Sequence, residues 1–558
     1  MNMWPSLLPR LAFLLCLLFV SSEPGSAAQV KLGKTTVIGS DIPLLKGEFF
    51  GGIPFAQAPV GNLRFARPVA EFSLGDAPTF DATKFGAACP QPLSAFTPPD
   101  LETSEDCLTL NVFRPAGVRA GTALPVMAWI FGGSFFTGTA TIFNASALVA
   151  HSIARGTPVV YVSFNYRLGA LGFPQGPEAA RQGVLNLGVQ DQIVALNWIQ
   201  KNIAAFGGDP AKVTLFGQSA GSVSVGLLYL NQDFRSWARA AIFESGQAGT
   251  TAIFDANKSV PQWDVFVDNT ATCAGPLRTA DVFACLRAAS ADEIMAGQNA
   301  GLAAMVGEFP FFPVLDGPQG LIPALPSALL RDGRGGRVPF MSGSVLDDGT
   351  LFVAASIAIE ASAQIADQVN ASFFPCASSR QLQAATAQLL ALYPDIPALG
   401  CPFDTGNDTF GISPVFKQAA ALLGDLVIQG PRRFWSQTAA HQGTEVFSYI
   451  FRDPQPENPP FLGVAHTAEL PYVYGDITVA ANGTGPGTLS AIMQDYWISF
   501  ATSLNPNDGK GMKRPEWEPY GARQQIMQLN STNTKMIPDD FRQAQMGFIN
   551  ENTALFCQ

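Results

Sequence analysis

The sequence predicts an α/β fold, with a mainly parallel central sheet and helices on both faces of that sheet. Short apolar runs typical of buried strands occur at residues 125–131, 158–164 and 213–216. A run with helical spacing, residues 191–206, lies between the last two and stops at Gly207-Gly208. Strands that alternate with helices are joined by crossovers, and crossovers make neighbouring strands parallel.

Two further apolar runs, residues 240–243 and 338–341, extend the same pattern towards the C-terminus. The chain has 558 residues, of which 47% are hydrophobic, so it is long enough to bury a large core. No linker rich in Pro, Gly or Ser divides it. We therefore expect one domain over residues 29–558.

The first 28 residues have the pattern of a secretory signal. Arg10 precedes an apolar run, residues 11–20, and small residues follow at 26–28. The run is too short to span a bilayer, and no other uncharged stretch is long enough. We expect cleavage after Ala28, a secreted, extracellular protein and no integral membrane association.

The formal net charge is −11. An acidic surface repels the phosphates of nucleic acids and anionic lipid headgroups, so neither is an expected partner.

The most informative segment is Gly217-Gln218-Ser219-Ala220-Gly221. A strand-like run precedes it and a helix-like run, residues 222–230, follows it. Gly-x-Ser-x-Gly between a strand and a helix is the nucleophile turn of the α/β-hydrolase fold. The glycines leave room for a strained turn that points the serine oxygen out of the sheet. Ser219 is therefore the predicted nucleophile.

A serine nucleophile needs a base, and the chain has only three histidines: His151, His441 and His466. In this fold the histidine follows the serine and the acid, which excludes His151. His441 ends a helix-like run just before Gly443, where histidine usually complements the helix terminus. His466 lies in a loop after Pro459-Pro460, and we expect it to be the base.

The acid should follow a strand between Ser219 and His466, and it orients the imidazole. Asp347 and Asp348 both follow the strand-like run at 338–341, and spacing does not separate them. The aspartate that is not the acid would be a solvated loop charge or a helix N-cap.

An oxyanion requires backbone N–H donors from the residue after the nucleophile and from an earlier strand end. Ala220 is the first. Gly133 and Ser134 follow the strand-like run at 125–131 in a glycine-rich segment and are the other expected donors.

Export makes disulfides the natural state of the cysteines that remain after Cys16 is removed with the signal. Pairing of sequence neighbours gives Cys89–Cys107, Cys273–Cys285 and Cys376–Cys401. Cys557 is left over, as a free thiol on a frayed tail or as a bridge to another chain. We expect a monomer, with a dimer linked through Cys557 as the alternative. No Cys-x-x-Cys spacing suggests a metal, and we expect neither a metal nor a cofactor.

Six Asn-x-Ser/Thr triplets are compatible with a secreted surface, and about half of such sites are expected to be glycosylated. They are at Asn144, Asn257, Asn370, Asn407, Asn482 and Asn530.

Over residues 51–542 the chain resembles the type B carboxylesterases, a family that includes fungal lipases of the yeast type and the cholinesterases. The matching stretches are GGIPFA from Gly51, SEDCL from Ser104, NYRL from Asn165 and NIAAFGGDPAKVTLFGQSAG from Asn202.

The resemblance implies the fold, an ester-hydrolysing activity and several roles. Asp348 falls on the acid and His466 on the histidine, while Gly133, Ser134 and Ala220 fall on the oxyanion positions. Ser245 falls on a serine just outside the triad, and Cys89–Cys107 and Cys273–Cys285 fall on family disulfides. The chain departs from the family in having Asp348 where Glu is usual, Gln218 where Glu is common, and Ser134 where Gly is usual.

The expected lid, residues 89–107, is short. Only 17 residues separate Cys89 from Cys107, and four of them are prolines. This favours an esterase for short-to-medium-chain or aryl esters, with a small-molecule ester as the substrate. A lipase or sterol esterase is the alternative. A non-catalytic binding module of the cholinesterase type is the alternative of another class, although such modules typically lose the triad. The lid contains no Trp that could stack on a quaternary ammonium, as a cholinesterase would require.

Overall fold

The computed structural model describes residues 28–94, 97–275, 281–305, 310–354, 359–477 and 485–558. The expected signal segment lies outside the described residues except for Ala28. Asn482 and residues 95–96 of the expected lid lie outside them as well.

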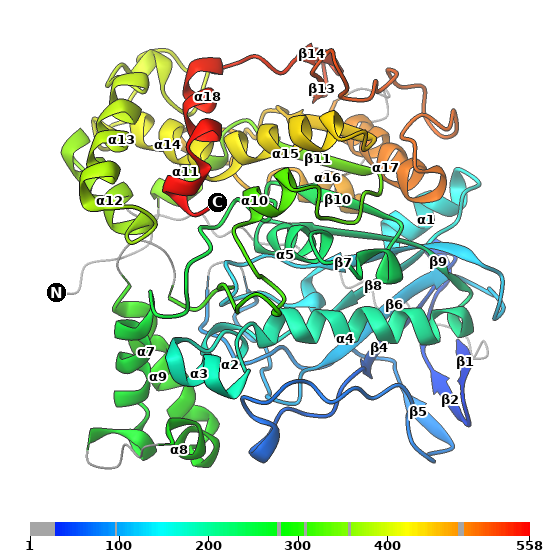
Figure 1. The fold of residues 1–558 in the computed structure, drawn as a ribbon. Coiled ribbons are helices and arrows are strands. Elements are labelled where there is room, and N and C mark those ends of the chain that lie inside the picture. The colour runs from blue at the N-terminus through cyan, green and yellow to red at the C-terminus, as the bar shows by residue number, and fades with distance from the viewer. Residues whose placement is uncertain (1–27, 95–96, 276–280, 306–309, 355–358, 478–484) are drawn as a thin grey trace.

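A large twisted sheet forms the centre of the molecule (Figure 1). Its strands follow in the order β14 (Lys535–Pro538), β13 (Gln525–Leu529), β12 (Val446–Phe451), β11 (Phe340–Val345), β10 (Ala240–Glu244), β9 (Gly208–Gln218), β7 (Leu124–Ile130), β8 (Val160–Phe164), β6 (Thr109–Pro115), β4 (Gly47–Pro54) and β3 (Ser40–Ile42). Neighbours from β13 to β8 run parallel, whereas the pairs at both edges are antiparallel. A small separate sheet contains β1 (Gln29–Leu32), β2 (Thr35–Ile38) and β5 (Thr79–Asp81).

The predicted strands correspond to β7, β8, β9, β10 and β11, with ends shifted by a few residues. The main difference is β9, which begins at Gly208 rather than at the predicted Val213. Gly208 pairs with Leu124 of β7, so pairing with a neighbouring strand extends β9 beyond its apolar run. Such pairing depends on tertiary context, which a local apolar pattern does not report.

Helices flank the sheet and form two outlying groups. They are α1 (Ser146–Ala154), α2 (Gly169–Gly172), α3 (Gly176–Gln182), α4 (Leu187–Asn202), α5 (Ala220–Tyr229), α6 (Phe234–Trp237), α7 (Val260–Asp268), α8 (Val282–Ala288), α9 (Ala291–Ala303), α10 (Pro326–Arg331), α11 (Asp348–Ala354), α12 (Ser362–Phe373), α13 (Ser379–Leu392), α14 (Phe416–Gly424), α15 (Gly430–His441), α16 (Leu470–Tyr474), α17 (Pro486–Ser503) and α18 (Gln543–Glu551). The predicted helix over residues 191–206 corresponds to α4 and a 3-10 turn that stops at Gly207, where φ is 86°. Helices α7–α9 and α12–α13 form the outlying groups, both at the left of Figure 1.

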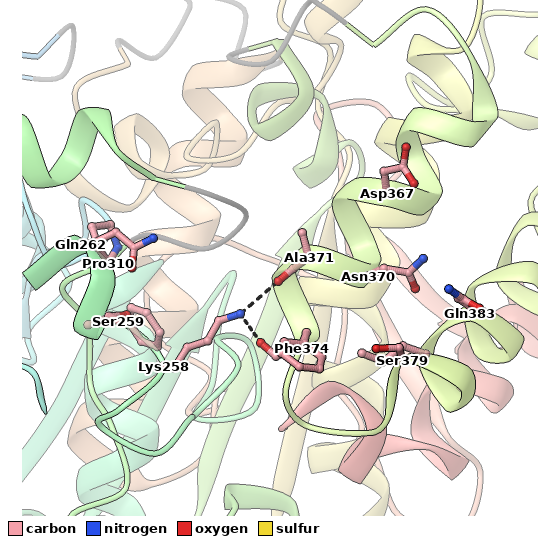
Figure 2. A pocket seen from close by; sticks show the side chains of 12 residues that line it. Lys258, Ser259, Gln262, Pro310, Asp367, Asn370, Ala371, Phe374, Ser379 and Gln383 are labelled. Atoms are coloured by element: carbon pink, nitrogen blue, oxygen red, sulfur yellow. Dashed lines mark hydrogen bonds between the residues drawn. The ribbon is translucent and has the colours of Figure 1, made fainter. Parts of the chain in front are cut away.

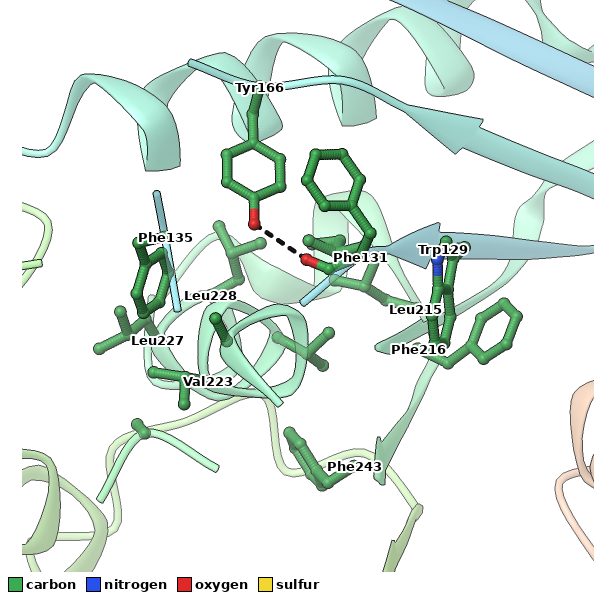
Figure 3. Packing of buried hydrophobic residues seen from close by; sticks show 14 of the residues in the cluster. Trp129, Phe131, Phe135, Tyr166, Leu215, Phe216, Val223, Leu227, Leu228 and Phe243 are labelled. Carbon is green, nitrogen blue, oxygen red and sulfur yellow. Dashed lines mark hydrogen bonds between the residues drawn. The ribbon is translucent and has the colours of Figure 1, made fainter. Parts of the chain in front are cut away.

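The core is densest around α5, which follows the predicted nucleophile. Every residue of α5 is buried, so this helix is enclosed on all sides and has no solvent-exposed face. Figure 3 shows Val223, Leu227 and Leu228 of α5 among aromatic side chains that include Phe135 and Phe243. This packing holds the start of α5 firmly against the sheet.

The disulfides Cys89–Cys107 and Cys273–Cys285 are present as expected. The predicted Cys376–Cys401 pair is wrong, because Cys376 is bonded to Cys557, 181 residues away. Cys401 is a buried free thiol. Closeness in sequence misled the pairing, because folding brings the C-terminus beside the end of α12.

Both alternatives predicted for Cys557 are therefore also wrong. It is neither a free thiol on a frayed tail nor a bridge to another chain. The neighbouring Gln558 is 3% exposed, and its backbone oxygen accepts a hydrogen bond of 2.6 Å from Ser327 Oγ.

In the part of the chain that the structure describes, no helix combines the length and apolar character needed to cross a membrane.

Candidate active site

Ser219 lies at the turn between β9 and α5, with φ 56° and ψ −129°. Positive φ is strained for serine, and such strain persists only where the surroundings enforce it. A Cβ at Gly217 would lie 2.7 Å from the carbonyl oxygen of Ile130, and a Cβ at Gly221 would overlap that same oxygen. Only glycine fits on either side, so the local sequence forces the turn that presents Ser219.

His466 and Asp348 come from different elements and meet closely. His466 lies in the loop before α16, and Asp348 is the first residue of α11. His466 Nδ1 is 2.7 Å from Asp348 Oδ1, and both side chains are buried. Asp348 Oδ2 accepts a hydrogen bond of 3.0 Å from the N–H of Val345, at the end of β11. A carboxylate fixed in this way holds the ring nitrogen Nδ1 and leaves Nε2 for proton transfer.

The partner of His466 Nε2 is Gln218, whose Nε2 lies at 3.2 Å. Among the contacts of the described residues, no hydrogen bond joins Ser219 Oγ to His466. Gln218 directly precedes Ser219, so the imidazole is beside the nucleophile but bonded to its neighbour. Catalytic hydrogen bonds are often long or misaligned before substrate binds, so this geometry is compatible with the roles expected of Ser219 and His466.

The other two histidines lie elsewhere. His151 Nε2 is 2.9 Å from the buried Asp495, which also pairs with Arg155 at 3.0 Å. His441 is exposed in the last turn of α15. Neither histidine has a contact with Ser219 or Asp348 among the described residues.

The three expected oxyanion donors lie around the same turn. Gly133 has φ 115°, and a Cβ there would overlap the carbonyl oxygen of Thr137. Ser134 has φ 52°, which turns the chain sharply after β7. Within the described residues, the N–H groups of Gly133, Ser134 and Ala220 donate to no protein acceptor. Unpaired N–H groups next to a nucleophile are the feature that an oxyanion requires.

The segment that carries Gly133 and Ser134 is supported by the packing of Tyr166 against Phe131. Phe131, two residues before Gly133, accepts a hydrogen bond of 2.9 Å from the Tyr166 hydroxyl, and the two rings stack with centroids 4.5 Å apart (Figure 3). A Cβ at Gly132 would lie 2.8 Å from the Cβ of Ser219, so the segment passes directly against the nucleophile.

The lid, residues 89–107, has no helix in its described part. The buried Gln91 joins it to the oxyanion segment. Its Nε2 donates to the carbonyl of Gly138 at 2.8 Å, and its Oε1 accepts from the N–H of Gly138 at 2.7 Å and from the Thr137 hydroxyl at 3.0 Å. The base of the lid is therefore fixed to the segment that carries Gly133.

Ser245 lies just outside these groups, after β10 and with φ 46°, and its N–H donates to Gly343 at 2.9 Å. Two buried acids lie nearby. Burial raises the pKa of Glu244 to about 8, and the Trp497 indole N–H donates to its carboxyl at 2.6 Å. Burial, and then the charges of Glu244 and Asp348, raise the pKa of Glu469 well above its ordinary value. Both carboxyls therefore keep their protons to a higher pH than an exposed glutamate does.

Sequence reasoning missed several of these neighbours. Glu469 follows His466 by three residues, a spacing that could have suggested it. Phe352 packs its ring 5.0 Å from the imidazole, and it shares α11 with Asp348. Gln91 carries no recognisable motif. Asp347 was expected to be a solvated charge or an N-cap, but it is 2% exposed and its carboxylate bonds to other loops.

A pocket of about 480 Å³ lies between α7 and the pair α12–α13 (Figure 2). Lys258 borders it and donates to the carbonyls of Ala371 and Phe374 at the end of α12. Ser219, Asp348 and His466 do not line this pocket. Within the described residues, no cluster of three or more His, Cys, Asp or Glu side chains could hold a metal ion.

Comparisons with known proteins agree with this geometry. The model of the carboxylesterase family matches residues 26–549. The secreted triacylglycerol lipase LIP1 of Gibberella zeae is 34% identical, over 95% of this chain and 91% of that protein. Lipase 4 of Diutina rugosa is 34% identical, over 98% of this chain and all of that protein. The crystal structure of Aspergillus niger EstA superposes with a TM-score of 0.81 at 26% identity, covering 95% of this chain and 99% of that one.

The resemblance noted in the sequence is thereby confirmed, as is the α/β-hydrolase fold. The family match spans Ser219, Asp348 and His466. The chain belongs to the carboxylesterase family and is a carboxylic ester hydrolase.

Proposed function

We propose that this protein is a secreted serine esterase that acts on short-to-medium-chain or aryl esters through Ser219, His466 and Asp348. The contact that carries the proposal is the 2.7 Å approach of His466 Nδ1 to Asp348 Oδ1, next to a serine held in a strained strand-to-helix turn.

The mechanism follows from these positions. Ser219 Oγ attacks the ester carbonyl while His466 Nε2 accepts its proton, and Asp348 stabilises the imidazolium. The N–H groups of Gly133, Ser134 and Ala220 bind the oxyanion. His466 then protonates the leaving alcohol, which leaves an acyl group on Ser219. Water, deprotonated by His466, releases the acid and restores the enzyme.

The short acyl preference rests on the lid. A long amphipathic flap could uncover a lipid-binding face at an interface, but the described part of residues 89–107 has no helix. Gln91 also fixes the base of this loop. The second candidate is a lipase, which the names of the similar fungal proteins favour.

Export and assembly complete the proposal. We propose that residues 1–28 are removed as a signal, since relatives are named secreted proteins. We propose a monomer, because Cys557 is engaged within its own chain.

The test is hydrolysis of p-nitrophenyl esters of increasing chain length by wild type and Ser219→Ala, with and without emulsified triglyceride. In a serine protease, loss of the nucleophile lowers turnover by about a million-fold, and a loss of several orders of magnitude is expected here. His466→Ala should behave similarly, whereas the exposed controls Ser236→Ala and His441→Ala should retain wild-type rates. A sharp rate increase on the emulsion would favour the lipase instead. If Ser219→Ala matched wild type on every ester, the proposed nucleophile would be wrong.

A further inference from the structure

Asp347, the neighbour of the proposed acid, has a buried carboxylate that is almost fully engaged. Its Oδ2 accepts a hydrogen bond of 2.8 Å from the N–H of Val464. Its Oδ1 accepts from the N–H of Phe403 at 2.9 Å and from the Cys401 thiol at 3.2 Å. Three donors from two other loops thus converge on one side chain.

One of those loops carries His466. Val464 lies two residues before His466 and makes two hydrogen bonds with Asp347. In the second one, the Asp347 N–H donates to the Val464 carbonyl at 3.0 Å. The Thr350 hydroxyl adds a bond of 2.7 Å to the carbonyl of Leu462. Gly463 has φ 56°, and a Cβ there would overlap the Asp347 carboxylate. The His466 loop therefore packs so closely against Asp347 that no side chain fits at Gly463.

Adjacent aspartates thus hold different parts of the same histidine. Asp348 contacts the imidazole ring, whereas Asp347 contacts the main chain that supports the ring. We propose that Asp347 is a positioning residue that fixes the His466 loop against the turn carrying Asp348, and so sets the hydrogen bond between ring and acid. The proposal rests on the proposed function, in which His466 is the base.

The physical reason is geometric. A displacement of about 1 Å in a reacting group can lower turnover about a hundredfold. At metal sites, hydrogen bonds behind a ligand contribute about ten- to hundredfold in activity, and we expect an effect of similar size for the support of His466. Without Asp347 the N–H groups of Val464 and Phe403 lose a buried acceptor, which is costly, so the loop would shift to find another.

The charges around Asp347 also make its role depend on pH. Burial raises its pKa to about 6, against the N–H groups of Phe403 and Val464, the Cys401 thiol and the Arg542 guanidinium, which lower it. Burial also raises the pKa of Cys401, which stays a donor, and lowers the pKa of the nearby Lys417. Asp348, the next residue, bonds to the His466 ring rather than to this group of donors. Below about pH 6 the added proton on Asp347 faces these donors, and the attachment weakens.

Loss of activity from this protonation is not acid unfolding. The folded-state pKa of Asp347 is raised above the ordinary value of 3.8. Its contribution to stability is therefore present at low pH and is lost as the pH rises through about 6. Acidification should lower turnover through this group without lowering stability through it.

The decisive variant is Asp347→Asn, which keeps the shape but replaces one acceptor oxygen by an N–H₂ donor. We expect kcat to fall about ten- to hundredfold with KM within about twofold, the pattern of a lost transition-state interaction. The fall of kcat at acidic pH should become less steep, because the variant lacks the protonation of Asp347. The downfield proton resonance of the imidazole N–H shared with Asp348 should shift or broaden. Asp404→Asn, an exposed carboxylate on the neighbouring loop, should match wild type in all three.

The proposal is wrong if Asp347→Asn keeps the kcat, the fall of kcat at acidic pH and the imidazole resonance of wild type, whatever its melting temperature. If this variant does not fold, Cys401→Ser and Cys401→Ala replace it. The serine keeps a donor to Asp347 and should retain kcat, whereas the alanine should lower kcat several-fold. Equal kcat for the two would overturn the proposal. The imidazole resonance needs no turnover, and Ser219→Ala tests the proposed function separately, so the two can fail independently.

Discussion

At the scale of single residues, burial decides what each acid near Ser219 does. Asp347 and Asp348 are neighbours of the same type, yet one accepts from backbone N–H groups and the other holds the imidazole. Glu244 and Glu469 are buried without a cationic partner among the described residues, and burial raises the pKa of both. Spacing could not separate these roles, because each depends on which groups the fold brings near.

The raised pKa of Glu244 predicts a pH-dependent stability. The folded state binds its proton up to about pH 8, whereas the unfolded chain releases it near the ordinary value of 4.5. The contribution of Glu244 to stability is therefore full below the unfolded pKa and is lost as the pH rises through about 8. Glu244→Gln cannot ionise and keeps an acceptor for Trp497. Its melting temperature should fall less than that of wild type between about pH 5 and about pH 9. If the melting temperatures of the two proteins changed with pH in the same way, the Glu244 carboxyl would not titrate in this pH range.

At the scale of elements, two short loops determine the site more than any helix does. The loop after β7 passes against Ser219 at Gly132, directly before Gly133 and Ser134, and Gln91 of the lid bonds to that loop. Glycines at positive φ and a single buried amide make this possible. The base of the lid is thus bonded to the oxyanion segment, which agrees with the preference proposed for small esters.

Gln91→Leu tests this connection. Leucine fills a similar volume but cannot bond to Thr137 or Gly138, so the oxyanion segment should loosen. Removal of a whole oxyanion donor costs about a hundred- to a thousandfold in kcat, and a displaced donor should cost about tenfold. KM for a short-chain ester should change little. Leu93→Ala, on the exposed part of the same loop, is the control. An unchanged kcat in Gln91→Leu would mean that the oxyanion segment holds its shape without the lid.

At the scale of the whole molecule, the C-terminus is attached to the body in several ways. The Cys376–Cys557 disulfide closes a segment of 181 residues. The Ile253 N–H donates to the carbonyl of Cys557 at 2.8 Å, and Gln558 Nε2 donates to Leu426 at 2.7 Å. The last two residues therefore link α12 with the segments before α7 and α15.

Cys557→Ser should lower the free energy of unfolding by about 2–5 kcal/mol, because a long loop regains freedom in the unfolded chain. Thermal unfolding under non-reducing conditions measures this loss. Activity at moderate temperature should persist, since the disulfide contacts none of the triad residues. Cys401→Ser, which removes a thiol but no disulfide, is the stability control. A disulfide-linked dimer of wild type on non-reducing gels would contradict the intrachain bond.

Sequence patterns were enough to predict the α/β-hydrolase fold, its main strands and the turn that carries Ser219. They could do so because these features are local: an apolar run, a helix stop at Gly207, and glycines without which the turn would clash. The chain order excluded His151, and the helix end at His441 and the loop around His466 favoured His466 as the base. The folded structure was needed to show which cysteine pairs with Cys376, that Asp347 is buried under the His466 loop, and that Gln91 bonds to the oxyanion segment. Each of these contacts joins residues distant in the chain, and its energy depends on burial and on which donors the fold delivers, neither of which a local pattern records.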